Sequence, residues 1–195
     1  IRDGEVRLYG DQFQGYPRDP NGYNAYFERC LTGTDVRLGC FVQSFDPDTR
    51  TVQTTQGAFT ADVIISSVHI DALFGFVYGK LQYHGRQFIP LWLPVESALP
   101  EDVTWIHYSG SEEHTRVTEF KKITGHESPS TLLGIEVPAD RGRHYPVPTA
   151  PELERFASYK KSFPADFYSI GRLGKFTYQG MPDAVRDAMD VVAAL

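Results

Sequence analysis

Two stretches near the ends of the chain repeat apolar residues with the period of an α-helix. In GYNAYFERCL, apolar side chains recur three, four, seven and eight residues after Tyr23, which predicts a helix with one half-buried face. The second stretch is predicted to begin at Pro182, since proline is favoured in a first helical turn. Its apolar stripe consists of Val185, Ala188, Met189, Val192 and Leu195. The pattern therefore predicts an early helix and a C-terminal helix.

Most of the chain between these helices follows the pattern of β-strands. Three segments divided by DPDT and QG turns predict a three-stranded meander: VRLGCFVQSF, TVQTTQ and FTADVIISSV. After a short helical stretch, HIDALFG, four segments predict an antiparallel sheet: LQYHGRQFIPLWL, DVTWIHYS, HTRVTEFKKIT and STLLGIEV. A helix over APELERFASYKK and a short strand over DFYSIG precede the last helix. This order of elements predicts an α+β fold.

The composition narrows the class of protein. With 195 residues, 41% of them hydrophobic, the chain can bury a core as one domain or two small ones. Its net charge of -6 argues against nucleic-acid binding, so a few placed cations would have to meet any anionic ligand. No apolar segment approaches the length of a membrane span and no signal-like stretch opens the chain, so we expect a soluble protein without membrane contact.

Cysteine and histidine positions argue against metal and Ser-His-Asp chemistry. Cys30 and Cys40 lack ligand spacing, and Cys30 lies on the apolar stripe of the first helix, so both are interpreted as reduced, structural thiols in a cytoplasmic protein. His107 and His114 are seven residues apart, the other histidines are scattered and GxSxG is absent. We therefore expect no metal site. The chain starts at Ile1 in what looks like a polar strand, which suggests a piece of a longer protein.

The stretch YSIGRLGKFTYQGM joins a short strand to the last helix through a turn that contains an arginine. Backbone N–H groups near Arg172 would suit a phosphate or pyrophosphate. The alternative, which the motif alone favours, is that Gly171 and Gly174 shape a turn while Arg172 pairs with a surface carboxylate. This stretch is therefore a weak anion-site candidate when it is taken by itself.

Tyrosines beside turns and one arginine within a strand are further candidates. Tyr23, Tyr145 and Tyr178 each lie next to Gly, Pro or a turn, where a phenol can line a cleft, although ordinary packing explains most such tyrosines. In HTRVTEF, Arg116 faces the side of the strand opposite to Glu119. Arg116 either covers a solvated face or points into a ligand cleft, and the sequence leaves both readings open.

Four stretches taken together resemble the UDP-galactopyranose mutase family, flavoenzymes that interconvert UDP-galactopyranose and UDP-galactofuranose. They are FQGYP followed by Gly22 and Tyr23, then YGKLQY, HTRVTEFK, and HYPVP with GRLGKFTYQGM. They occur in the family's order and near its spacing. The resemblance covers essentially the whole chain but matches only the later half of a mutase.

The resemblance implies a division of the chain into four parts. These are 1–21, the entrance segment of the substrate cleft; 22–75, the returning part of a bipartite, Rossmann-like FAD-binding domain; 76–150, the antiparallel substrate-binding sheet; and 151–195, which completes the FAD-binding domain. The family's first βαβ unit with its GxGxxG cradle, and the helical domain that holds the uracil, have no counterpart in the sequence.

The same resemblance implies the ligands and their contacts. In the family, N5 of reduced FAD is the nucleophile on the anomeric carbon while UDP leaves and returns, so no catalytic side chain is expected. The substrate-binding residues implied for a UDP-sugar are Arg2, Tyr23, Arg116, Tyr145 and Tyr178. The cofactor-binding residues implied are Gly171, Arg172, Met181 and His107. A homodimer is left open.

Three positions depart from the family pattern. Gly180 stands where the family usually has an aspartate after Tyr178, His107 replaces an asparagine before the sheet arginine, and His84 replaces an arginine after Tyr83. These changes point to a different sugar nucleotide, altered catalysis or an inactive relative. The alternatives are therefore a non-catalytic sugar-nucleotide-binding relative and an FAD oxidoreductase of the amine-oxidase type.

Overall fold

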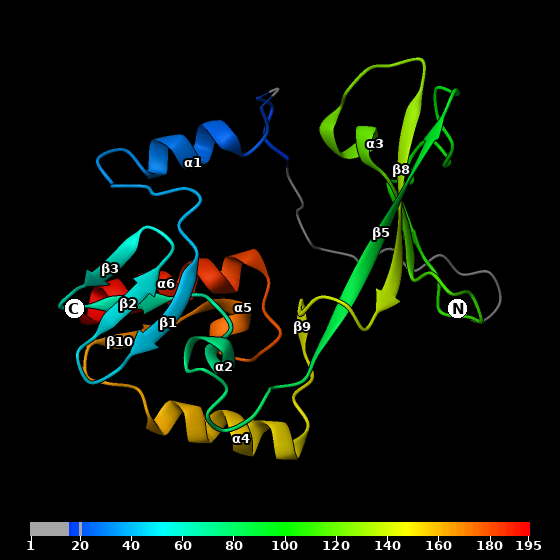
Figure 1. Cartoon of the computed structure of the whole chain (residues 1–195). Coiled ribbons are helices and arrows are strands. Elements are labelled where there is room, and N and C mark those ends of the chain that lie inside the picture. Colours follow the sequence, from blue (N-terminus) through cyan, green and yellow to red (C-terminus); the bar gives the residue numbers. More distant parts are fainter. Residues whose placement is uncertain (1–15, 20) are drawn as a thin grey trace. The chain divides into compact units, whose positions relative to one another are not determined.

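The computed structural model describes residues 16–19 and 21–195, which fall into two compact units. The first unit contains the described residues up to Val36 together with Ile89–Ile135. The second contains Arg37–Phe88 and Glu136–Leu195. Two long strands, β5 (Tyr83–Leu93) and β8 (Thr131–Ala139), continue from one unit into the other (Figure 1).

The second unit contains the predicted meander, but the third predicted strand is divided. Strands β1 (Val42–Asp46), β2 (Thr51–Thr54) and β3 (Gly57–Thr60) pair antiparallel in that order. The stretch FTADVIISSV, predicted as one strand, breaks after Thr60 and continues as β4 (Ile64–Ser66). Strand β4 leaves the meander and pairs in parallel with β10 (Phe167–Ser169), more than a hundred residues later. A parallel partner so distant in sequence cannot be found from local turn signals.

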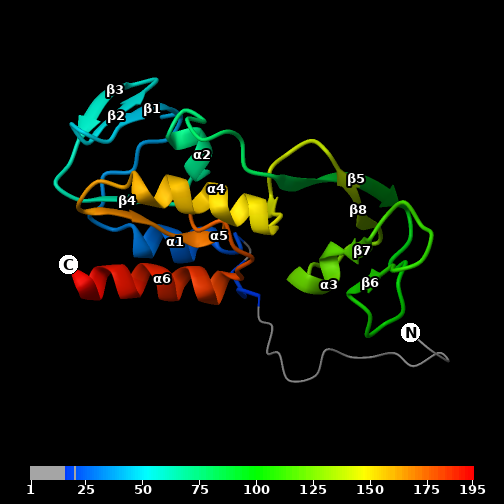
Figure 2. The same ribbon diagram turned by 90° about the horizontal axis from the view of Figure 1, so that it is seen from below.

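Helices lie on both faces of this parallel pair. The helices of the second unit are α2 (Ile70–Leu73), α4 (Ala150–Lys161), α5 (Gly171–Gly174) and α6 (Met181–Ala194). Figure 1 shows β10, and Figure 2 shows β4, between α4 and α6. Proline in the first turn of α4 and of α6, as predicted, costs no helical hydrogen bond there.

Aromatic side chains form the core of the second unit. Its buried members are Phe45, Ile70, Leu73, Leu81, Tyr83, Tyr159, Phe167 and Phe176. The rings of Phe45 and Phe167 stack with their centroids 5.3 Å apart, which joins the meander to the parallel pair. Asp71 is fully buried beside this core, where it pairs with Arg143 and accepts a hydrogen bond from Leu81 N at 2.9 Å. The ion pair compensates the cost of burying that carboxylate.

The first unit contains α1 (Asn24–Cys30), β6 (Trp105–His107), β7 (Arg116–Glu119) and α3 (Phe120–Thr124). A five-stranded sheet has the order β6-β7-β8-β5-β9, where β9 is Tyr145–Pro146. The pair β6–β7 is antiparallel, as predicted, and β5 also pairs antiparallel with β9, which was not predicted as a strand. The prediction that HTRVTEFKKIT is one strand is wrong, because the chain turns into α3 directly after Glu119. The segment DVTWIHYS was predicted as a strand, but β6 within it is only three residues long.

Two predicted apolar helix faces are formed but are not covered by the described residues. Tyr26 and Phe27 of α1 are 54% and 53% exposed, and Met189 and Val192 of α6 are 67% and 65% exposed. Periodicity predicts which face of a helix is apolar but carries no information about what packs on it. Cys30 is likewise exposed, so its interpretation as a structural thiol on a half-buried helix face is wrong, although both cysteines are free thiols as expected.

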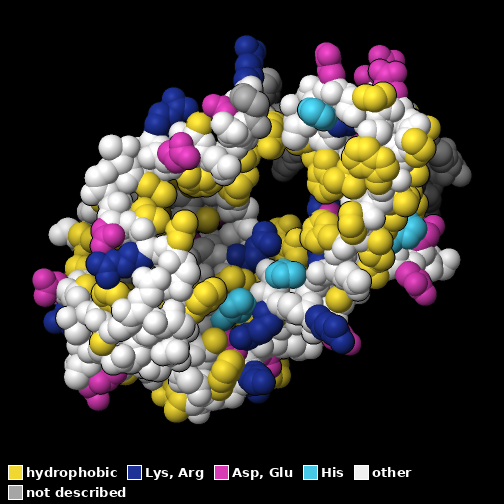
Figure 3. All heavy atoms as spheres, turned by 45° about the horizontal axis from the view of Figure 1, so that its top comes forward, with side chains coloured by type: hydrophobic (Ala, Val, Ile, Leu, Met, Phe, Trp, Pro, Cys, Tyr) yellow, Lys and Arg dark blue, Asp and Glu magenta, His cyan; other side chains and the backbone are white. Residues whose placement is uncertain are grey.

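Apolar side chains also gather on the first unit's part of the sheet (Figure 3). On the outer half of β5, Ile89, Leu91 and Trp92 are exposed, and so is Leu132 of β8. Within the described part of the chain, no helix is long and apolar enough to cross a lipid bilayer. The structure thus contains one unit with an aromatic core and one whose sheet carries its large apolar side chains mostly outward.

Candidate functional site

Three of the predicted site residues meet in the second unit. Arg172 belongs to α5, Tyr145 to β9, and Tyr178 to the loop before α6. The guanidinium carbon of Arg172 lies 4.7 Å from the ring centroid of Tyr145 and 4.8 Å from that of Tyr178. The two rings are almost parallel, at an angle of 19°, with their centroids 6.1 Å apart. A cation at this distance from two aromatic faces is attracted to both, so the three side chains stabilise one arrangement.

A main-chain carbonyl group also holds the guanidinium group of Arg172 in place. Its Nε and Nη2 both donate to the carbonyl oxygen of Gln179, at 3.0 and 2.6 Å. The alternative in which Arg172 pairs with a surface carboxylate is therefore not what the structure shows. Both positions of the turn nevertheless favour glycine. Gly171 has a φ of +69°, and a Cβ at Gly174 would lie 2.5 Å from Ser169 Oγ.

Sequence reasoning missed two members of this site, Arg86 and Glu136. Arg86 of β5 places its guanidinium carbon 4.7 Å from the ring centroid of Tyr145 and forms an ion pair with Glu136 of β8. The side chain of Glu136 is only 2% exposed, so the pair anchors Arg86 firmly. We call Arg86, Glu136, Tyr145, Arg172 and Tyr178 the arginine–tyrosine cluster.

A signal for Arg86 was present in the sequence. His84, which stands at the position of an expected arginine, is paired with Tyr145 in the register of β5 and β9. Residues two apart on a strand share a face, so Arg86 lies on the same side of β5 as His84. Glu136 had a weaker signal, as the one charged residue in the apolar run LLGIEV.

The start of α6 carries a carboxylate of its own. Gly180 is the N-cap residue, and its N–H donates to Asp183 Oδ2 at 3.1 Å. A carboxylate in the first turn complements the positive end of the helix dipole, so Asp183 occupies the place where an external anion would otherwise be favoured. Met181, a predicted cofactor contact, is 70% exposed at this helix start.

A polar network lies behind the cluster. Asp187 accepts hydrogen bonds from Lys175 Nζ at 2.7 Å and from Gln179 Nε2 at 2.8 Å. Burial works against ionisation of Asp187, but these two donors outweigh it and lower its pKa. The main-chain oxygen of Gln179 also accepts the two hydrogen bonds from Arg172, so the network connects α6 to the cluster.

In the first unit the structure pairs two other predicted residues. His107 of β6 and Arg116 of β7 are opposite each other in the antiparallel register. Tyr23 caps α1 and packs edge-on against Tyr16, with the ring centroids 5.6 Å apart. Arg2 and most of the predicted segment 1–21 lie outside the described residues. Each unit thus holds part of the predicted site.

A buried carboxylate organises the strand that carries Arg116. Glu119, at the end of β7, is fully buried and accepts hydrogen bonds from Ala98 N, Leu99 N, Thr131 Oγ1 and the ammonium of Lys122. Burial alone would raise the pKa of Glu119, but these donors outweigh it and bring the pKa to about 2. Glu119 therefore stays ionised and joins β7 to the loop before β6 and to β8.

The described residues were also compared with the ligand sets of metal sites. Among the residues that the structure describes, no group of three or more His, Cys, Asp or Glu side chains is arranged to hold a metal ion. The donors of the arginine–tyrosine cluster are guanidinium groups and phenols, which suit an anion.

Comparison with known proteins gives consistent results. A family profile described as UDP-galactopyranose mutase matches residues 3–178. The UDP-galactopyranose mutase of Mycoplasma pneumoniae is 25% identical over 190 residues, which are 90% of this chain and 46% of that protein. A crystal structure of reduced UDP-galactopyranose mutase matches with a TM-score of 0.69 and 17% identity, over 92% of this chain and 50% of the other.

A structure from Exiguobacterium sp. 255-15, described as a protoporphyrinogen oxidase, shares the fold with a TM-score of 0.61. It is 16% identical, and the match covers 89% of this chain and 50% of the other. At such identities the two structural matches show the fold alone. The chain spans about half the length of the relatives that it matches.

Proposed function

Since this chain belongs to the UDP-galactopyranose mutase family, as the match over residues 3–178 shows, we propose that it forms the substrate-sheet half of a flavin-dependent isomerase. The proposed reaction interconverts the pyranose and furanose forms of UDP-galactose. The observation that carries this proposal is the arginine–tyrosine cluster, in which two guanidinium groups and two phenols converge. Such donors suit a diphosphate and not a neutral substrate.

The diphosphate is the part of the substrate that these residues would serve. When the bond between the sugar and UDP breaks, negative charge develops on the diphosphate, and fixed cations and hydroxyl donors stabilise it. Tyr145 and Tyr178 would donate to the phosphate oxygens while Arg172 lies against both rings. Arg116, Tyr23 and Arg2 are proposed as further diphosphate contacts. Each of these groups binds and orients, so no side chain needs to act as a proton donor.

The residues around α5 fit a flavin cofactor. A Cβ at Gly171 would meet nothing within 4 Å, so the main chain there is open to a bound group. Arg172, Gly171, Met181 and His107 are proposed to contact FAD, which would supply N5 as the nucleophile when bound in its reduced form. The division into parts of a bipartite FAD-binding domain, over 22–75 and 151–195, belongs to the same proposal, as does the substrate-binding sheet over 76–150.

One observation bears on the alternative that the protein binds a sugar nucleotide without catalysis. Gly180 stands where the family usually has an aspartate, so that carboxylate is missing from this chain. Asp183 Oδ2, however, lies only 3.7 Å from the place where a Cβ of residue 180 would be. We propose that Asp183 supplies the missing negative charge, which favours activity over mere binding. The fold shared with an oxidase adds no support for amine oxidation.

The test combines binding with turnover. In a mutase polypeptide that contains this chain, with FAD reduced by dithionite, UDP-galactofuranose should be converted to UDP-galactopyranose, and UDP should compete. Arg116→Ala should weaken UDP binding by more than about tenfold, because a charged hydrogen bond is worth about 1.5 to 3 kcal/mol. Arg141→Ala, at an exposed arginine, is the matched control. Absence of both turnover and UDP binding would refute the function, whereas binding without turnover would select the non-catalytic alternative.

A further inference from the structure

Tyr145 is central to the arginine–tyrosine cluster but belongs to a very short strand. The guanidinium carbons of Arg86 and Arg172 each lie 4.7 Å from the centroid of its ring. Strand β9 contains only Tyr145 and Pro146, and proline has no N–H to donate to a sheet. So short a strand fixes a side chain weakly by itself. Residues outside β9 must therefore help to place this phenol.

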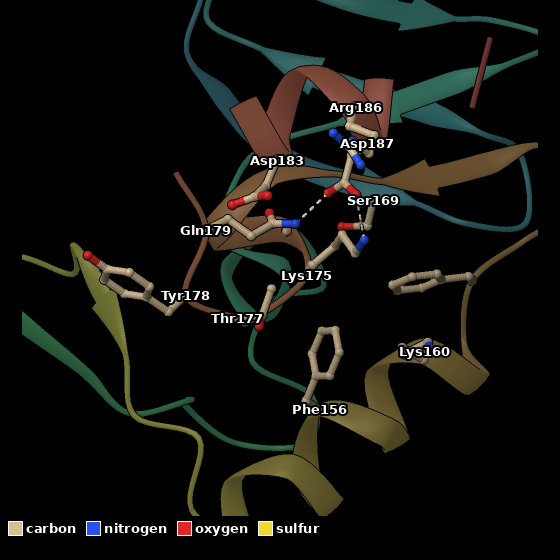
Figure 4. Close-up of a pocket in the computed structure, with 12 residues that line it drawn as sticks. Phe156, Lys160, Ser169, Lys175, Thr177, Tyr178, Gln179, Asp183, Arg186 and Asp187 are labelled. Carbon is tan, nitrogen blue, oxygen red and sulfur yellow. Dashed lines mark hydrogen bonds and ion pairs between the residues drawn. The ribbon is translucent and has the colours of Figure 1, made fainter. Parts of the chain in front are cut away.

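The position of Tyr178 depends on the same ring. Figure 4 shows Tyr178 extending from the loop before α6 on the side away from Lys175 and Asp187, so its ring points out of the polar network. The side chain is 72% exposed, and its ring stacks on that of Tyr145 with the centroids 6.1 Å apart. The placement of Tyr145 therefore affects both phenols of the cluster.

The chain two residues before Tyr145 is held by its side chain and by its main chain. The guanidinium group of Arg143 forms an ion pair with the fully buried Asp71, and its Nη2 also donates to Leu81 O at 3.3 Å. The main-chain oxygen of Arg143 accepts a hydrogen bond from His69 Nε2 at 2.7 Å. His69 is the N-cap residue of α2, and Asp71 lies in the first turn of that helix. A buried ion pair and a separate hydrogen bond thus fix residue 143 to the start of α2.

The same contacts extend to the helix that carries Arg172. The guanidinium carbon of Arg143 lies 4.4 Å from the ring centroid of Tyr83, and the Tyr83 hydroxyl donates to Leu173 O in α5 at 3.3 Å. The ring of His69 packs edge-on against Tyr83, with the centroids 4.9 Å apart. Burial raises the pKa of Tyr83, so its hydroxyl stays protonated and remains a donor. We define the Arg143 anchor as His69, Asp71, Tyr83 and Arg143.

We infer that the Arg143 anchor consists of positioning residues for the diphosphate site: it fixes the chain that enters β9, so that the phenols of Tyr145 and Tyr178 are in place before the ligand binds. Groups that are ordered in advance lose less conformational entropy on binding. The inference rests on the proposed function, because the ligand is the UDP-sugar assigned there. The contacts within the anchor are independent of that assignment.

Two other roles for Arg143 need to be distinguished from positioning. One is a direct contact with the diphosphate, which the structure disfavours because the buried carboxylate of Asp71 already balances the charge and Tyr83 lies against the guanidinium group. The other is a contribution to folding stability alone. Only positioning makes the effect of Arg143 on UDP binding depend on the hydroxyl groups of the two tyrosines.

The test is a double-mutant cycle on the complete mutase polypeptide, titrated with UDP. Arg143→Lys keeps a positive charge beside Asp71 but loses the planar, forked geometry of the guanidinium group. It should weaken UDP binding about fivefold in the wild-type background and less than about twofold in the Tyr145→Phe/Tyr178→Phe background, because the hydroxyls through which it acts are gone. Arg141→Lys, at an exposed arginine two residues earlier, should leave the UDP affinity unchanged in both backgrounds.

His69 provides a second test that leaves the buried ion pair intact. His69→Leu removes the donor to the main-chain oxygen of Arg143 and should weaken UDP binding about threefold. His69→Gln, whose side-chain N–H can reach the same oxygen, should restore most of the affinity. Val147 N, directly after β9, donates to Gln82 O at 3.0 Å. Without ligand, hydrogen exchange at this amide should speed up at least about fivefold in His69→Leu but not in His69→Gln.

Several results would overturn the inference. Equal losses of UDP affinity from Arg143→Lys with and without the two hydroxyls would assign Arg143 a direct contact or a purely structural role. Unchanged UDP affinity in both Arg143→Lys and His69→Leu, or unchanged exchange at Val147 in His69→Leu, would likewise contradict it. A wild-type polypeptide that does not bind UDP would refute the proposed function. Exchange at Val147 would then still decide whether the anchor holds the chain around β9.

Discussion

The two units hold their candidate site residues in place by different means. In the second unit, Tyr145, Arg172 and Tyr178 border an aromatic core that joins the meander, α2, α4 and β10. In the first unit, Arg116 lies on a strand fixed at its end by the buried, multiply hydrogen-bonded Glu119. Leu133 is the first unit's one buried large apolar side chain among the described residues. The second unit thus rests mainly on a packed aromatic core with the Asp71–Arg143 ion pair beside it, whereas the first unit depends mainly on one buried carboxylate, so removing either feature should affect its own unit first.

The largest expected effect comes from opening the aromatic core. Phe167→Ala should destabilise the second unit by about 3 to 5 kcal/mol, because Phe167 packs against Phe45, Phe74 and Phe163 and its removal leaves a cavity. Urea unfolding followed by circular dichroism measures the change. Phe41→Ala, at a side chain that is 71% exposed, is the control and should change stability by less than about 0.5 kcal/mol. Equal losses in the two variants would contradict the role of the core.

Glu119→Gln is expected to cause a smaller loss of stability, confined to the first unit. The amide keeps the shape but presents N–H groups to donors that need an acceptor, which should cost about 2 to 3 kcal/mol. Hydrogen exchange should speed up in β7 and α3 while β10 and α4 stay protected. The exposed Glu113 in Glu113→Gln provides the matched control. Loosening spread evenly over both units would show that Glu119 does not organise the first unit in particular.

The same carboxylate predicts a pH dependence of the first unit's stability. The pKa of Glu119 falls from its ordinary value of 4.5 to about 2 in the folded chain. A lowered pKa contributes stability that is complete above pH 4.5 and is lost as the pH falls from 4.5 toward 2. Acid should therefore loosen β7 over this pH range. Glu119→Gln should remove the first unit's added acid sensitivity, and an unchanged acid transition in this variant would contradict the assignment.

The smallest expected effect concerns how the cluster is held. Arg86→Lys keeps the positive charge beside Glu136 but loses the flat contact with Tyr145, so UDP binding should weaken about three- to fivefold, or about 0.5 to 1 kcal/mol. Titration calorimetry on the complete mutase polypeptide measures this change. Arg141→Lys, at an exposed arginine outside the cluster, is the matched arginine-to-lysine control. If both variants bind UDP as tightly as the wild type, Arg86 does not help to orient Tyr145.

The sequence predicted the local elements better than their surroundings. Apolar periodicity located α1, α4 and α6, and turn residues located the meander, because these signals are local. The parallel pairing of β4 with β10 was missed, since the two strands are separated by about a hundred residues. The turn from β7 into α3 was also missed, because Phe120 and Ile123 continue the apolar pattern of the strand before them.

The candidate site was predicted in part. The resemblance selected Tyr145, Arg172 and Tyr178, and the structure brings these three together. Arg86 and Glu136 were missed because their pairing depends on the neighbouring positions of β5 and β8, which no single segment encodes. The assignment of Arg116, His107 and Tyr23 to the ligands stays a prediction.

The most direct measurement is a calorimetric titration of UDP into the complete mutase polypeptide and into its Tyr145→Phe/Tyr178→Phe variant. The variant keeps both rings beside Arg172 and removes only the two hydroxyl donors. If the arginine–tyrosine cluster holds the diphosphate, the variant should bind UDP more than about tenfold more weakly, because each hydroxyl loses a hydrogen bond to a charged group. UDP affinity equal to that of the wild-type polypeptide would place the diphosphate elsewhere and contradict the proposed site.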